Sequence, residues 1–199
     1  MSQLITLIFC CGFTVIAIVL HEYAHGFMAD RLGDPTPEQT RRLTFDPRRH
    51  IDIFGTLVMP LILLSLCGTG FGWAKPIPLN ASYWKNPRRD ALYILCAGIA
   101  VNLAAAVLFW VFLKIPLPQG VQKVFFCAMT ANLGLAVMNL IPAPGTDAYR
   151  LLSRSVSREF SRQYLEKPKT ALLLTVVYVA SGLFTHALAF IQGLAGRLV

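Results

Sequence analysis

The sequence predicts an all-α polytopic membrane protein, a helical bundle of four transmembrane helices plus one re-entrant or short fifth segment. Of the 199 residues, 55% are apolar and only 14% are charged, whereas about a quarter are charged in soluble domains. The mean hydropathy is +0.57, and several apolar stretches approach the roughly 20 residues that a helix needs to cross a bilayer. These observations exclude a soluble enzyme, a disordered chain and a secreted disulfide scaffold.

The first apolar stretch, residues 4–29, is predicted to be a retained helix, because no Lys or Arg precedes it and no A-x-A cleavage site follows it. Four further apolar segments cover residues 51–72, 91–113, 121–141 and 170–192. Helix-breaking residues occur at both ends of segment 51–72, namely Gly55, Pro60, Gly68, Gly70 and Gly72. We therefore expect this segment to be re-entrant or partly inserted, with an ordinary tilted helix as the alternative.

The connections between the apolar segments differ in charge. Basic residues concentrate in residues 30–50, 73–90 and 150–169, whereas the connection 114–120 holds one Lys and two Pro. Because basic loops favour the cytoplasm, we expect the N-terminus outside and segment 121–141 running inward. The same rule explains the formal charge of +8, so we expect the lipid bilayer as a partner and no nucleic acid.

The strongest chemical signal is the run His21-Glu22-Tyr23-Ala24-His25 near the inward end of the first helix. Histidines at i and i+4 lie on one helical face, so both imidazoles can bind one zinc ion while Glu22 stands beside it as a base. The alternative is a pair of neutral packing histidines at the membrane interface, with Glu22 facing water. Three adjacent polar groups need partners in lipid, and a metal would supply them all.

Zinc hydrolases need a third protein ligand and leave the fourth position for water. Asp147 is the candidate, because it follows an apolar helix that unwinds into a turn rich in Pro and Gly. The crossing order given above brings the histidines and Asp147 to the same, cytoplasmic leaflet. A complete crossing by segment 51–72 would instead place Asp147 about 30 Å away, so the metal site and the re-entrant segment support each other.

H-E-x-x-H in a membrane helix, with a later N-L-x-P-x-P-x-x-D at 139–147, resembles the site-2 protease family of intramembrane zinc metalloproteases. Further stretches resemble its compact bacterial and archaeal branch: Phe45-Asp46-Pro47, His50-Ile51-Asp52, Phe54-Gly55-Thr56-Leu57, Gly72-Trp73-Ala74-Lys75-Pro76, Asn86-Pro87-Arg88-Arg89-Asp90, and Ala97-Gly98 with Asn102. The chain departs from the family at Ala148, where Gly is usual, and at Ile99, where Pro is usual.

The resemblance implies that His21, His25 and Asp147 bind one catalytic Zn²⁺ and that Glu22 activates a water molecule. It suggests that Asn102 points toward the site, as a contact to the substrate or its oxyanion. From the residues alone, Asn102 is as well explained by a hydrogen bond between membrane helices.

The resemblance further implies hydrolysis of a peptide bond within or near a transmembrane segment of membrane-protein substrates, in a prokaryotic cell membrane. A single membrane-embedded domain would span 1–199, with its core at 1–153 and a basic loop and helix at 154–199. One alternative is a catalytically weak or inactive protein of the same fold that binds metal or sequesters substrates. An ion transporter is a weaker alternative, because the sequence shows no inverted repeat, and nothing in the sequence indicates the oligomeric state.

Other polar and aromatic residues receive simpler interpretations. We expect His50 to be interfacial, His186 to be a packing or interface histidine, and Trp73, Tyr83 and Trp84 to form an interfacial belt. The stretch 72–76 could instead offer an extended edge to a substrate strand. The cysteines, at positions 10, 11, 67, 96 and 127, form no C-x-x-C pair and are expected to pack as small hydrophobic residues.

Overall fold

The computed structural model describes residues 3–58 and 74–155, residues 158–161, and scattered positions from there to 193. Within these residues all regular structure is helical and no strand occurs. Three helices are long and apolar enough to cross a membrane, judged by length and composition. They are α1 (Gln3–Arg31), α4 (Pro87–Leu113) and α5 (Gln119–Leu140).

These three helices confirm the predictions for residues 4–29, 91–113 and 121–141 to within a few residues at each end. The predicted helix at 170–192 and the stretch 59–73 lie largely or wholly outside the described residues. Four spanning helices and a fifth segment therefore stay a prediction, whereas the all-helical class is confirmed for the part of the chain that the structure describes.

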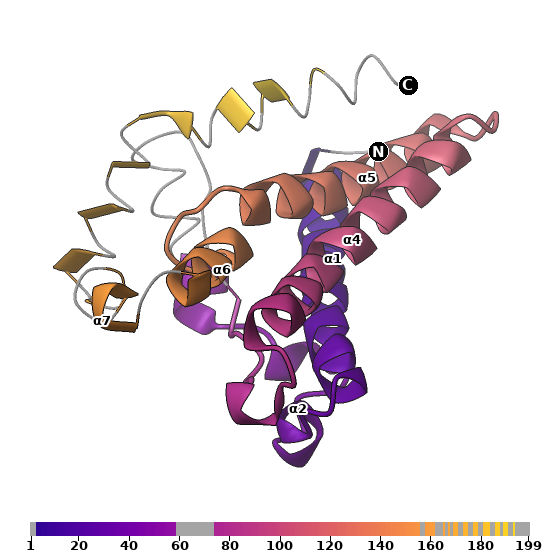
Figure 1. Cartoon of the computed structure of the whole chain (residues 1–199). Coiled ribbons are helices and arrows are strands. Elements are labelled where there is room, and N and C mark those ends of the chain that lie inside the picture. The colour runs from indigo at the N-terminus through magenta and orange to yellow at the C-terminus, as the bar shows by residue number, and fades with distance from the viewer. Residues whose placement is uncertain are drawn as a thin grey trace.

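The three long helices pack against one another, and α4 and α5, joined by a short turn, run in opposite directions (Figure 1). Their contact buries Ala106 and Leu113 of α4 against Met129 of α5. A disulfide joins Cys10 of α1 to Cys127 of α5, so the expectation that the cysteines pack as small hydrophobic residues was wrong for these two. The two residues lie 117 positions apart, and only the packing of α1 on α5 brings them together.

Part of the connection between α1 and α4 begins and ends at neighbouring positions, because residue 75 lies beside residue 50. The chain forms the short helices α2 (Thr36–Gln39) and η1 (Pro47–Arg49) and the π-helical turn η2 (Ile53–Val58). After the stretch 59–73, Lys75 N donates to His50 O at 2.8 Å. A single complete crossing would separate the two ends of segment 51–74 by about 30 Å, so this segment makes no net crossing of the bundle.

The buried carboxylate of Asp34 holds the segment that leads into α4. Asp34 is fully buried, and its carboxylate accepts hydrogen bonds from Thr36 N at 3.0 Å, Asn80 N at 2.7 Å and Trp84 Nε1 at 3.4 Å. Trp84 is therefore buried, with the Arg154 guanidinium 4.7 Å from its ring centroid. The prediction of an interfacial Trp84 was wrong, because its indole N–H serves as a partner for a buried acceptor.

His50 also differs from its prediction. Its side chain is fully buried, and its Nε2 lies 2.8 Å from Thr44 O. Because its backbone carbonyl receives Lys75 N, His50 stabilises the point where segment 51–74 closes. It lies inside the protein rather than facing the membrane interface.

Candidate metal centre

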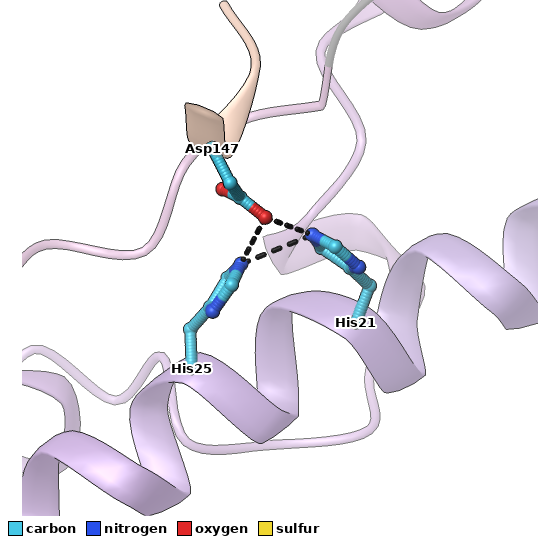
Figure 2. Close-up of side chains that lie close together, drawn as sticks. All are labelled: His21, His25 and Asp147. Atoms are coloured by element: carbon cyan, nitrogen blue, oxygen red, sulfur yellow. Dashed lines mark hydrogen bonds and ion pairs between the residues drawn. The ribbon is translucent and has the colours of Figure 1, made fainter. Parts of the chain in front are cut away.

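Three predicted ligands meet at the end of the bundle where α1 and α5 finish. His21 and His25 lie one turn apart on α1, and Asp147 is the first residue of α6 (Asp147–Ser155). Asp147 Oδ2 lies 2.7 Å from His21 Nε2 and 3.0 Å from His25 Nε2, and the two Nε2 atoms are 3.0 Å apart (Figure 2). All three side chains are buried, and together they form a group that could hold a metal ion.

The turn after α5 brings Asp147 into this position. The helix ends at Leu140, and Ile141 is extended. Thr146 Oγ1 then donates to Ile141 O at 2.7 Å, while Asp147 N donates to Asn139 Oδ1 at 3.2 Å. Prolines in the turn prevent the helix from continuing, and Asn139 holds the start of α6. The N-L-x-P-x-P-x-x-D pattern is thus a local structure that returns a carboxylate toward α1.

The hydrogen bonds of the two imidazoles determine which of their nitrogens face the centre. His25 Nδ1 lies 2.6 Å from the carbonyl oxygen of Ile94, and His21 Nδ1 lies 3.1 Å from Asn102 Oδ1. Both Nδ1 atoms face acceptors and therefore carry protons, so in the neutral imidazoles both Nε2 lone pairs point at Asp147 Oδ2. Three acceptors meeting at one point require a cation between them, and this donor set fits a metal ion.

The Asp147 carboxyl is suited to the same role. Burial alone would raise the pKa of this carboxyl, but in the absence of a metal ion the adjacent histidines, when protonated at Nε2, bring its pKa well below the usual range through their charge and hydrogen bonds. Arg150, one turn further along α6, has its NH1 atom 3.4 Å from Asp147 Oδ1. The carboxyl is therefore ionised, with Oδ2 directed at the histidines.

Glu22 is buried beside this group but is not part of it. Its Oε2 accepts a hydrogen bond from the backbone N–H of Ile77 at 2.8 Å. Its other oxygen, Oε1, has no hydrogen-bond partner among the described residues. A buried carboxylate with one oxygen held and one free can accept a proton from a water molecule placed at the centre.

Asn102 is fully buried on α4, and its contact to His21 joins α4 to α1. Its Nδ2 is a buried donor with no partner in the part of the chain that the structure describes. The structure thus provides the interhelical hydrogen bond that the sequence allowed. It also leaves the amide N–H₂ group of Asn102 available next to a metal-ligand candidate.

Gly98 contributes to the centre in a way that the sequence did not reveal. A Cβ at this position would lie 2.7 Å from both His21 Cε1 and His25 Nε2, closer than real Cβ contacts come. The glycine therefore makes room on α4 for both imidazoles. The two departures from the family pattern, Ile99 and Ala148, both lie within helices, α4 and α6 respectively, and they leave this arrangement intact.

Part of the stretch 72–76, for which the sequence allowed an extended edge open to a substrate, is engaged with its own chain. The N–H group of Lys75 donates to His50 O. Further along the chain, Ile77 N donates to the Glu22 carboxylate and Asn80 N donates to the Asp34 carboxylate. Pro76 and Pro78 carry no N–H group. Residues 72 and 73 lie outside the described residues. Within the stretch 72–76, the N–H group of Lys75 is therefore not open to a substrate strand, and the edge as a whole stays a prediction.

The fold and the site define a class, a membrane helix bundle with buried His, His and Asp side chains converging near a glutamate. The chain is 34% identical over 148 residues to "Putative zinc metalloprotease YwhC" of Bacillus subtilis, which covers 69% of this chain and 64% of that protein. It is 30% identical over 171 residues to "Putative zinc metalloprotease Rip2" of Mycolicibacterium smegmatis, covering 82% and 63%, and 30% identical over 170 residues to the Rip2 of Mycobacterium tuberculosis.

These relatives are members of the site-2 protease family, and the chain belongs to the same family. It spans somewhat less than two thirds of the length of each of these relatives. No family model matches the chain, and no solved structure matches it.

Proposed function

We propose that this protein is an intramembrane zinc metalloprotease that hydrolyses a peptide bond within or near a transmembrane segment of membrane-protein substrates. The observation that carries the proposal is the convergence of two Nε2 lone pairs and one carboxylate oxygen, all buried in a bundle of apolar helices. Buried ionisable groups in a membrane helix are costly and are retained for function. The names of the homologues support zinc as the metal.

His21, His25 and Asp147 would hold one Zn²⁺, which supplies a Lewis acid that lowers the pKa of water and polarises a carbonyl group. The N–H of His25 donates to Ile94 O and thereby fixes the ring. Glu22 accepts the proton of the attacking water through Oε1 and later transfers it to the leaving amine nitrogen. Asn102 Nδ2 donates to the substrate oxygen on which negative charge develops.

The membrane location constrains the substrate. A peptide bond in a transmembrane helix is shielded by the hydrogen bonds of that helix, so the substrate must unwind locally. We therefore propose substrates with helix-breaking residues near the cut site. We also propose that the site faces the cytoplasmic leaflet of a prokaryotic cell membrane, and the basic loops support this orientation.

A metal-binding protein without proteolytic activity is the second candidate. Such a protein needs ligands but no base, whereas here Glu22 lies buried beside the ligands with one carboxylate oxygen free. This arrangement favours the protease. The transporter alternative is weaker, because the sequence shows no inverted repeat.

The test is incubation of the purified protein with a panel of single-span membrane substrates, with and without a zinc chelator. We expect cleavage that the chelator abolishes and that zinc restores. Glu22→Gln should keep its zinc while cleavage falls by about 10²–10⁴-fold, because the amide cannot accept a proton. Cleavage by Glu22→Gln at the wild-type rate would contradict the mechanism, and zinc bound without any cleavage would favour the metal-binding alternative.

A further inference from the structure

The side chain proposed as the base is held by a backbone group far away in the sequence. Ile77 N donates to Glu22 Oε2 at 2.8 Å across 55 residues. Pro76 and Pro78 flank Ile77, so its amide is the only N–H group in the triplet. An amide N–H does not titrate, so it can orient the Glu22 carboxylate without protonating it.

Two contacts fix Ile77 on α1. Its N–H group meets Glu22, and its side chain packs where Gly26 leaves room, since a Cβ on Gly26 would overlap with Ile77 Cδ1. Glu22 and Gly26 are four residues apart and therefore lie on the same face of α1. Ile77 is only 4% exposed, so this attachment is enclosed by the protein.

Arg42 holds the backbone that precedes Ile77. Its NH2 atom donates to Lys75 O at 2.8 Å and to Pro76 O at 3.3 Å. The residue is 8% exposed, and its burial lowers the pKa of Arg42 while attraction to Glu22 opposes that change. A buried guanidinium needs acceptors, and here it receives them from the two residues that lead to the Ile77 amide.

We propose that Arg42 is a positioning residue of the protease site, which fixes the Glu22 carboxylate through the carbonyl groups of residues 75 and 76 and the N–H group of Ile77. This inference rests on the proposed function. Glu22 has several rotatable bonds, and Oε1 must face water at the centre while Oε2 is held. Misplacing a catalytic group by about 1 Å can cost on the order of 10²-fold in rate, so losing this support should reduce turnover rather than substrate binding.

The first test compares Arg42→Ala with Arg42→Lys, using Arg48→Ala as the control for loss of a nearby exposed basic residue. The readouts are zinc content, kcat and KM for a substrate that the wild-type protein cleaves. We expect Arg42→Ala to lower kcat by at least tenfold, with KM within about twofold and zinc unchanged. Arg42→Lys retains a charged donor and should recover most of the lost kcat, and Arg48→Ala should match the wild-type protein.

The second test removes the N–H group itself. Ile77→Pro deletes this donor in a segment already flanked by prolines, whereas Ile77→Val keeps the donor and shortens only the side chain. We expect kcat of Ile77→Pro to be at least tenfold below that of Ile77→Val. The double variant Arg42→Ala with Ile77→Pro should be no slower than the slower single variant, because both act through one hydrogen bond.

Two results would overturn the inference. One is equal kcat for Ile77→Pro and Ile77→Val. The other is a loss of zinc in Arg42→Ala, which would make Arg42 a structural residue of the metal centre. Failure of the proposed function gives a different result, namely no zinc-dependent cleavage by the wild-type protein, or undiminished cleavage by Glu22→Gln.

Discussion

A Cβ on Gly98 would lie 2.5 Å from Cε1 of His25. The smallest residue of α4 is thus placed where the two histidines of α1 need space, and the centre depends on a close approach of two helix backbones. His25 Nδ1 is fixed by Ile94 O, one turn earlier on α4. The ring cannot move away from Gly98 without losing this hydrogen bond, so α4 controls the orientation of the imidazole.

We expect Gly98→Ala to reduce zinc occupancy strongly, because the added methyl group displaces both imidazoles. Gly134→Ala on α5 is the matched control, since a Cβ there meets no atom of the described residues within 4 Å. It should keep full zinc and gain about 0.5–1 kcal/mol in the free energy of unfolding, as expected for Gly to Ala in a helix. Elemental analysis and thermal unfolding of both variants check this, and full zinc in Gly98→Ala would contradict the crowding argument.

Removing any one ligand should lower zinc occupancy. We expect His21→Ala, His25→Ala and Asp147→Ala each to bind zinc far more weakly than the wild-type protein, because a three-ligand site loses a ligand. Glu38→Ala, which removes an exposed carboxylate on α2, should keep its zinc. Elemental analysis of the purified variants is the measurement, and full zinc in Asp147→Ala would eliminate Asp147 as the third ligand.

Two substitutions of Asn102 separate its contact to His21 from its free amide. Asn102→Leu removes both and should weaken zinc binding by about 10–100-fold, because the support of a metal-binding histidine is lost. Asn102→Asp keeps an acceptor for His21 Nδ1 but removes the Nδ2 donor. We expect it to keep zinc and to lose about 10²–10³-fold in kcat, as for other oxyanion donors. A wild-type kcat in Asn102→Asp would mean that the Nδ2 donor has no role in turnover and that Asn102 acts only through its contact to His21.

The orientation in the membrane can be tested by labelling single cysteines on a background without free thiols. Cysteines placed at residues 40, 80 and 160 should react from the cytoplasmic side, because the loops around them are basic. A cysteine at residue 118, in the short connection between α4 and α5, should react from outside. Labelling of residue 80 exclusively from outside would contradict the return of segment 51–74 to its starting side.

Residues 21–25 and 147 could be located from the sequence because each carries a local signal. The i, i+4 spacing of His21 and His25 fixes one helical face, and the prolines before Asp147 mark the end of an apolar helix. The ends of α1, α4 and α5 were equally accessible, since long apolar runs bounded by basic residues and prolines define membrane helices. The predicted order of membrane crossings then brought Asp147 to the same leaflet as the two histidines.

The contacts that support the centre could not be predicted in this way. Arg42, Ile77 and Gly98 act through partners that are far away in the sequence, and the segment 74–80 has no periodic pattern that shows where its amides point. His50 and Trp84 resembled interfacial residues by type and position. Only the three-dimensional structure shows that their polar groups serve buried partners.

The hydrogen bond between Lys75 N and His50 O has a consequence for the length of segment 51–74. This hydrogen bond holds the residues on either side of segment 51–74 close together, so the distance between the two ends of the segment is fixed. Lengthening a flexible loop twofold costs only about 0.6 kcal/mol in closure entropy. A change in the length of this segment would therefore leave α1, α4 and the candidate metal centre in the same relative position.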